Sequence, residues 1–106
     1  MFEVEVTKSV TGKIIRVTSK QWFHIVESHD YMAGNLSKVM ETINSPDCII
    51  KGLKNELIAL RHYFKTNITE KYCVVVYKEN DEGFIITAFF TSKPENIKKR
   101  GVIWQK

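Results

Sequence analysis

The segment from Tyr72 to Lys78 most constrains the fold, because its apolar side chains alternate onto both faces of the strand that it predicts. A strand that is apolar on both faces is covered on both, so this one should lie in the centre of a sheet. The segments 57–64 and 84–91 are also strand-like, and the polar residues 80–83 predict a hairpin turn into the second of them. The second half of the chain therefore predicts an antiparallel meander.

The period-two alternation of strands assigns the side chains of the two flanking strands to faces. In the strand 57–64, one face is predicted to carry Ile58, Leu60, His62 and Phe64, and the other Leu57, Ala59, Arg61 and Tyr63. In the strand 84–91, one face is predicted to carry Phe84, Ile86, Ala88 and Phe90, and the other Ile85, Thr87, Phe89 and Thr91. The two threonines are thus expected on one sheet face.

The first half of the chain predicts a β-hairpin and two helices. Residues 2–6 and 13–17 form the hairpin, with a turn at 9–12. Thr18 and Gln21 match a capping box, in which each side chain satisfies a free N–H group at a helix start. Helical spacing gives two apolar stripes, Trp22, Ile25, Val26 and His29 in the first helix and Leu36, Val39, Met40 and Ile43 in the second, with Asn35 or Asp30 as the second cap. Each helix has one apolar face, so both should lie on one side of the sheet.

Short strands at 48–50 and 102–104 complete the predicted order of hairpin, two helices and antiparallel meander, which is an α+β fold. With 106 residues, of which 43% are hydrophobic, the chain should form one globular domain, 1–106. It has no membrane-spanning run and no signal-peptide pattern at its start, so a cytoplasmic location is expected. Cys48 and Cys73 stand far apart without a CxxC motif and are expected to be buried, reduced thiols.

The side chains that could carry chemistry are of the types that metal-independent cleavage of RNA requires. Such a reaction needs a base for the 2′-OH, an acid for the leaving oxygen, and donors or cations for the charged phosphorane. Histidine is the usual general base or acid at neutral pH, and the two candidates are His24 and His29. They lie roughly 140° apart on the first predicted helix, so they cannot point the same way. Arg61 offers a planar fork for phosphate oxygens, and His62 is a third histidine. The structural alternative is that the histidines fill core positions and Arg61 only solubilises its face.

The net charge of +4 permits a polyanionic partner. The predicted RNA-binding residues are two aromatic side chains that could stack on bases and five cations, namely Tyr63, Phe89, Lys71, Lys93, Lys98, Lys99 and Arg100. Alternatively, the aromatic residues belong to the core and the basic tail is a solvated edge. The carboxylates Asp30, Asp47, Asp81 and Glu82 form no recognisable metal set, which disfavours a metal-dependent deoxyribonuclease. No cofactor and no metal site is predicted.

The order of these residues resembles a known family. The blocks are Thr18-x-x-x-Trp22-x-His24-Ile25-x-x-x-His29-x-x-Met32, Val39-x-Glu41-Thr42-Ile43-x-x-Pro46-Asp47, Arg61-x-Tyr63, Lys71-Tyr72-x-Val74-Val75-Val76 and Gly83-Phe84-Ile85-Ile86-Thr87-Ala88-Phe89-Phe90-Thr91. They look like the phage-type branch of the barnase–EndoU–colicin–RelE nucleases. The resemblance implies two helices packed on a four-stranded or larger antiparallel sheet. It also implies a metal-independent RNase, often a toxin or a phage or defence effector. By matching position, its catalytic candidates are His24, His29, Arg61, Thr87 and Thr91.

Two departures from the family pattern bear on activity. The usual His-Pro-Glu-Met is His29-Asp30-Tyr31-Met32, so the acidic group expected at Tyr31 is missing, and Phe89 replaces a usual tyrosine. The main hypothesis is an RNA endonuclease that forms a cyclic phosphate, with RNA and a cognate antitoxin or immunity protein as partners and no membrane. The alternative is a non-catalytic RNA- or protein-binding module on the same fold, which the missing acid favours.

Overall fold

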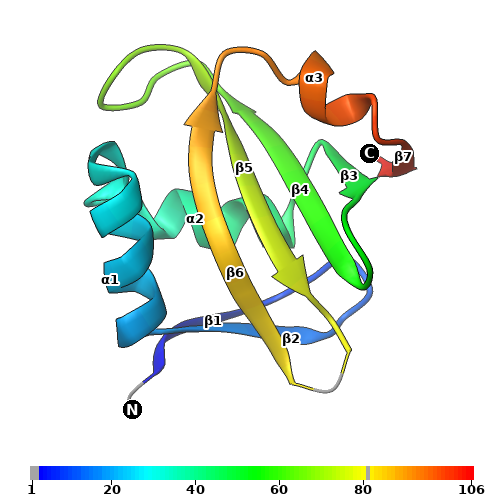
Figure 1. The fold of residues 1–106 in the computed structure, drawn as a ribbon, viewed down its shortest axis with the longest axis horizontal. Helices are drawn as coiled ribbons and strands as arrows, with labels where there is room; N and C mark the ends of the chain where they lie inside the picture. The colour runs from blue at the N-terminus through cyan, green and yellow to red at the C-terminus, as the bar shows by residue number, and fades with distance from the viewer. Residues whose placement is uncertain (1–2, 81) are drawn as a thin grey trace.

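A computed structural model describes residues 3–80 and 82–106. Its strands form one seven-stranded sheet in the order β1-β2-β6-β5-β4-β3-β7 (Figure 1). None of the helices in these described ranges is long and apolar enough to cross a lipid bilayer. The elements are β1 (Glu3–Lys8), β2 (Ile14–Thr18), α1 (Ser19–Ser28), the 3₁₀ helix η1 (Asp30–Met32), α2 (Leu36–Asn44), β3 (Cys48–Lys51), β4 (Glu56–Tyr63), β5 (Lys71–Lys78), β6 (Gly83–Thr91), α3 (Glu95–Lys98) and β7 (Val102–Gln105).

The predicted meander is confirmed, with β5 antiparallel to both β4 and β6 and at the middle of the sheet. Its side chains are buried on both faces, as the sequence predicts. The α+β class is also confirmed, but the sheet is larger than four strands and is not wholly antiparallel. The hairpin β1–β2 extends it at one edge and β3 and β7 at the other, while α3 is a helix that the sequence did not predict.

Among the strands of the described ranges, a single pairing is parallel, and it joins β2 to β6. It is short, with Ile15 opposite Gly83 and Arg16 opposite Phe84. A Cβ atom on Gly83 would collide with the carbonyl oxygen of Ile14, so a side chain there would push β2 away from β6. Beyond this contact the hairpin turns away from β6 (Figure 1). The hairpin then packs on α2, where the amide of Asn44 donates to the carbonyl oxygen of Lys8 at 2.9 Å.

Two apolar clusters cover the two faces of the sheet. The larger lies between the sheet and the helices α1 and α2, as predicted, and includes Ile25, Val39, Ile43, Val75 and Tyr77. The smaller lies on the opposite face and contains Cys48, Ile50, Ile58, Leu60 and Val74, with Ile97 of α3 packed against it. Cys73 belongs to the first cluster, so the two cysteines, both buried and free as predicted, are on opposite faces. Burial raises the pKa of the Cys73 thiol to about 11, which keeps the thiol protonated.

A β-bulge in β6 changes the predicted alternation. Val76 pairs with Thr87 and Tyr77 with Ile85, so Ile86 is an extra residue on β6. The extra residue puts Ile85 on the same face as Ala88 and Phe90, in the larger cluster. The sequence prediction, which placed Ile85 with Thr87, was therefore wrong. The predicted common face of Thr87, Phe89 and Thr91 is unaffected, because these residues follow the bulge.

The predicted capping box at α1 is half formed. The Thr18 hydroxyl accepts from the N–H of Gln21 at 3.1 Å, but the Gln21 side chain donates to the carbonyl oxygen of the bulge residue Ile86. At α2, Asn35 occupies the N-cap position without a capping hydrogen bond. Its buried side chain instead donates to the carbonyl oxygen of Tyr31 at 3.0 Å and to Asn67 at 2.9 Å.

We expect Thr18→Ala to lower the free energy of unfolding by about 0.5–2 kcal/mol, the usual value of an N-cap hydrogen bond. Thr18→Ser is the matched control, since it keeps the hydroxyl and should retain most of the stability. Urea denaturation of both variants measures the difference. Equal destabilisation by Ser and Ala would show that the cap is not its source.

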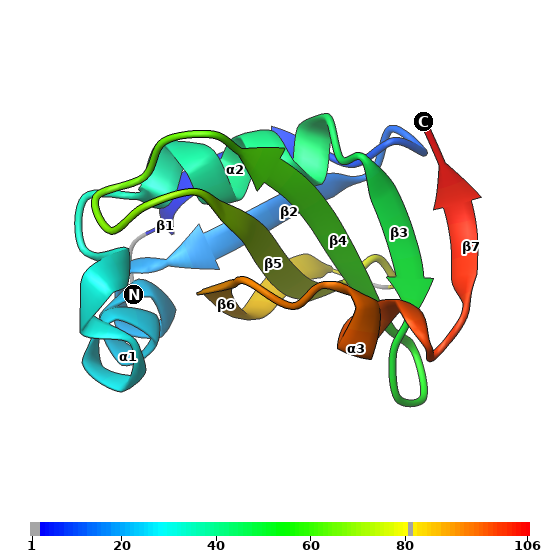
Figure 2. The same ribbon diagram turned by 90° about the horizontal axis from the view of Figure 1, so that it is seen from above.

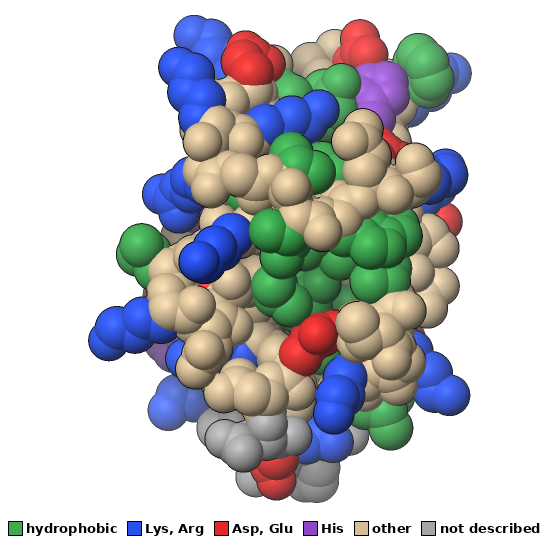
Figure 3. Space-filling model, turned by 90° about the vertical axis from the view of Figure 1, so that its right-hand side faces the viewer, with side chains coloured by type: hydrophobic (Ala, Val, Ile, Leu, Met, Phe, Trp, Pro, Cys, Tyr) green, Lys and Arg blue, Asp and Glu red, His purple; other side chains and the backbone are tan. Residues whose placement is uncertain are grey.

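The sheet ends at β7, which confirms the predicted C-terminal edge strand. β7 pairs with β3, with Trp104 opposite Ile49 and Gln105 opposite Cys48. On this side of the molecule hydrophobic side chains gather in the middle, with lysines and arginines around them (Figure 3). A mostly apolar hollow of about 240 Å³ adjoins β7 and is lined by Val10, Thr11, Ile49, Leu57, Glu79, Ile103 and Trp104. The hollow lies at the opposite edge of the sheet from α1.

Candidate functional site

The sheet face opposite α2 is called here the open face. Strand register defines three rows on it across β6, β5 and β4: Thr91–Tyr72–His62, Phe89–Val74–Leu60 and Thr87–Val76–Ile58. The α3 helix lies on this side of the sheet over β3 and β4, and α1 lies beyond β6 (Figure 2). The first row is polar and aromatic, whereas the other two belong mostly to the smaller apolar cluster. A polar strip thus crosses the open face at the end of β6.

His29 lies at the edge of the open face. The α1 helix ends at Ser28, and His29 is its C-cap residue, with its N–H donating to the carbonyl oxygen of Ile25 at 2.9 Å. Its ring centroid is 5.6 Å from that of Phe89. The ring therefore faces the sheet, as predicted, although it projects from the cap and not from the helix itself.

Tyr31 also contacts the imidazole of His29. The Tyr31 hydroxyl lies 3.4 Å from Nδ1 of His29. The Tyr31 ring stacks on Phe90 at 5.7 Å between centroids, which fixes it against the core side of β6. A hydroxyl can donate to or accept from Nδ1. It thus occupies the place where the resemblance implies an acid.

The threonines of β6 present hydroxyl groups on the open face. Thr91 Oγ1 accepts from the backbone N–H of Lys93 at 3.1 Å. This contact orients the hydroxyl oxygen and leaves its hydrogen free to donate elsewhere. Thr87 lies two rows below Thr91, in register with Val76. Both threonines therefore share a face with Phe89, on which His29 packs.

His24 lies away from this face. Its side chain is 53% exposed, and Nδ1 is 3.7 Å from Glu27 on the same helix. The next residue, Ile25, is buried in the larger cluster. Because successive helical residues are about 100° apart, His24 turns toward solvent when Ile25 faces the core. The structure separates the two histidines, as their spacing predicts.

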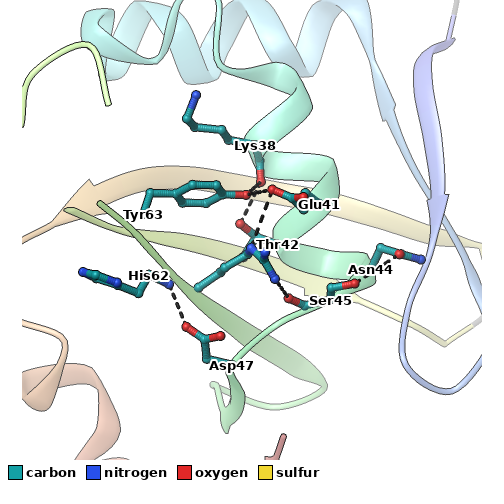
Figure 4. A network of polar contacts seen from close by, with 9 residues as sticks. Lys38, Glu41, Thr42, Asn44, Ser45, Asp47, His62 and Tyr63 are labelled. Carbon is teal, nitrogen blue, oxygen red and sulfur yellow. Dashed lines mark hydrogen bonds and ion pairs between the residues drawn. The ribbon is translucent and has the colours of Figure 1, made fainter. Parts of the chain in front are cut away.

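Arg61 and Tyr63 point to the opposite face, toward α2. Arg61 Nη1 donates to the carbonyl oxygen of Ser45, the C-cap residue of α2, at 2.6 Å, and its Nε is 3.6 Å from Glu41. The Tyr63 hydroxyl donates to Glu41 at 2.5 Å (Figure 4). Burial, together with this carboxylate, raises the pKa of the Tyr63 phenol. The predicted face of β4 is thus confirmed, and it places Arg61 and Tyr63 across the sheet from the β6 threonines.

A second polar group lies at the same end of the sheet. The sequence prediction named His62 and Lys71 but missed their partners, Glu70 and Ser92. His62 Nε2 lies 2.5 Å from Oε2 of Glu70, and Lys71 Nζ donates to the Ser92 hydroxyl at 2.6 Å. A cavity of about 250 Å³ beside them is lined by Glu70, Lys71, Tyr72 and Ser92. The alternation of β4 had placed His62 on a face with apolar residues. His62 joins the polar strip only through strand pairing, which places it opposite Tyr72 and, one strand further, in line with Thr91.

The four predicted RNA-binding cations of the tail are solvent-exposed, namely Lys93, Lys98, Lys99 and Arg100. They lie in and around α3, which packs on the open-face cluster through Ile97. Their charges thus border the face that carries Thr91. In the described residues, no three His, Cys, Asp or Glu side chains come together as a possible metal site.

Neither a curated protein nor a solved structure matches the chain. A family model does match, the one described as phage-Barnase-EndoU-ColicinE5/D-RelE like nuclease2, over residues 3–105. The match runs from the first residue of β1 to the last of β7. It confirms the resemblance on which the sequence prediction rests. The chain therefore belongs to the phage-Barnase-EndoU-ColicinE5/D-RelE like nuclease2 family.

Proposed function

We propose that this protein is an endoribonuclease that cleaves RNA by attack of the ribose 2′-OH, without a metal ion. One observation carries the proposal: the imidazole of His29 packs on Phe89, on the face where Thr87 and Thr91 present hydroxyls. A general base such as imidazole and hydroxyl donors are what this reaction needs. Membership of a nuclease family supports a nucleic acid as the substrate.

In the proposed mechanism His29 is the general base. In the tautomer that this role requires, Nδ1 carries the hydrogen and donates to the Tyr31 hydroxyl oxygen, which orients the ring and leaves Nε2 unprotonated for the substrate. Nε2 takes the proton of the 2′-OH, and the 2′ oxygen forms a bond to phosphorus. The bond from phosphorus to the 5′ oxygen then breaks, and the 5′ oxygen takes a proton from water. The products are a 2′,3′-cyclic phosphate and a 5′-hydroxyl.

Hydroxyls and cations on the same face would stabilise the phosphorane. The Thr91 hydroxyl, positioned by the N–H of Lys93, donates to one of its oxygens. Thr87 is four residues away on the same strand, about 13 Å at about 3.3 Å per residue, so its hydroxyl serves a neighbouring phosphate. The exposed cations at and after Lys93 neutralise neighbouring phosphates. Arg61 is given no part in this mechanism, because it is bound to the end of α2 on the other face.

The expected reaction is cleavage of single-stranded RNA that continues in excess chelator and leaves 2′,3′-cyclic phosphate ends. The purified protein is incubated with a labelled RNA, with and without chelator, and the ends are identified by mass spectrometry. The same RNA with 2′-deoxyribose at the cleavage site is the control and should stay intact there, since it lacks the nucleophile. Loss of cleavage in chelator, or ends with a 5′-phosphate, would contradict 2′-OH attack.

The same assay distinguishes the endoribonuclease from the second candidate function, a non-catalytic RNA- or protein-binding module. The observation that favours this candidate is that Tyr31, and not an acid, stands beside His29. RNA that is bound and not cut would support it.

We extend the main proposal to a role as a toxin or a phage or defence effector acting in the cytoplasm. The support is the description of the family, which names phage and colicin nucleases. A nuclease that cuts the RNA of its own cell would require a cognate antitoxin or immunity protein.

A further inference from the structure

An exposed aromatic side chain stands at the end of β4. Phe64 is 80% exposed and is the most exposed large hydrophobic residue in the described chain. It is not isolated, because its ring meets His62 edge-on at 4.7 Å between centroids. The ring of His62 in turn lies 4.8 Å from Tyr72. Three adjoining rings thus occupy the β4 end of the polar strip on the open face.

Polar contacts fix the middle ring of this group. Nε2 of His62 is 2.5 Å from Glu70, and the backbone N–H of His62 donates to Asp47 at 2.7 Å. The side chain of His62 is only 22% exposed. It therefore supports Phe64 from one fixed position. The cavity lined by Lys71 and Tyr72 opens beside it and supplies a cation.

The His62 end of the aromatic group is separated from Thr91 by the width of two strands. His62 and Thr91 are in one row, with Tyr72 between them. Adjacent strands are about 4.8 Å apart, so the His62 backbone lies about 10 Å from that of Thr91. A proton-transfer group must come within about 3.2 Å of the atom it serves. His62 and Thr91 therefore fit two neighbouring nucleotides better than one phosphate.

We propose that Phe64, His62 and Tyr72 form a stacking subsite for an unpaired nucleobase of single-stranded RNA, next to the scissile phosphate. The inference rests on the proposed function and adds its substrate class. A base stacked on an exposed ring must be unpaired and unstacked from its neighbours, so duplex RNA would not fit. Stacking accepts every base, because each has a π-face. Lys71 contacts the backbone of the same nucleotide.

Binding of a short single-stranded RNA with 2′-O-methyl riboses tests the subsite, because this RNA cannot react and cleavage does not interfere. Phe64→Ala should raise its Kd about 5–150-fold, the usual effect of removing one stacking aromatic. Phe64→Trp should restore binding. Phe23→Ala is the matched control, since Phe23 is 65% exposed and also lies beside a histidine, but on α1. It should leave Kd unchanged, and annealing the RNA to its complement should remove the effect of Phe64→Ala.

Each other outcome overturns a defined part of the proposal. If Phe64→Ala and Phe23→Ala bind alike while the parent protein binds and cleaves RNA, the subsite is wrong and the proposed function stands. If Phe64→Ala weakens single-stranded and duplex RNA equally, the subsite does not select unpaired bases. If the parent protein neither binds nor cuts RNA, both proposals fail.

Discussion

His29→Gln should lower the rate of RNA cleavage by about 10²–10⁴-fold, the usual contribution of one positioned proton-transfer group. Glutamine keeps a polar side chain of similar size at the C-cap of α1, so the melting temperature should stay close to that of the parent protein. Single-turnover cleavage and thermal unfolding, measured on the same preparation, test the two halves of this prediction. If His29 only filled space, His29→Gln would change the melting temperature and leave the rate of RNA cleavage unchanged.

His24→Gln is the internal control for this experiment. It removes a histidine from the same helix, but from an exposed position beside Glu27. Cleavage by this variant should equal that of the parent protein. A His29→Gln protein that is folded and cuts RNA at the parent rate would rule out His29 as the base. A large loss in His24→Gln would instead move the site to the outer side of α1.

Arg61→Met should lower the free energy of unfolding by about 1.5–3 kcal/mol, the range for a hydrogen bond that involves a charged group. The substitution removes the donor to the last turn of α2 at Ser45 and the charge beside Glu41. RNA cleavage by the folded fraction should stay close to the parent rate, because Arg61 lies on the face opposite Thr91. Urea denaturation measures the change in stability. The rate of RNA cleavage is measured separately, at a temperature well below the unfolding transition, where the variant is folded.

Lys20→Met is a matched control for the loss of one positive charge. Lys20 is exposed at the start of α1, so its replacement should change neither stability nor cleavage. The family resemblance implies the opposite result for Arg61, namely a catalytic role. An Arg61→Met protein with parent stability and cleavage reduced about 100-fold would support that role and would require α2 to move.

The histidines and the two sheet faces show how far the sequence could predict the candidate site. The alternation of β4 was sufficient to separate Arg61 from His62, because each residue in a strand turns its side chain opposite to the last. In β6 the same rule failed at Ile85. A bulge leaves no certain mark in composition, and the bulge at Ile86 changes the phase of every residue before it.

By itself, the sequence determined α1 and α2, most of the strands and the central place of β5. These features depend on caps and periodic patterns within a few residues, which act through local backbone preferences and burial. Only the tertiary structure decided the parallel contact of β2 with β6, the packing of His29 on Phe89 and the pairing of His62 with Glu70. Strand register follows from packing summed over the whole molecule. The site depends on that register, because its residues come from α1, β4 and β6, which are distant in sequence and meet only when the sheet closes on the helices.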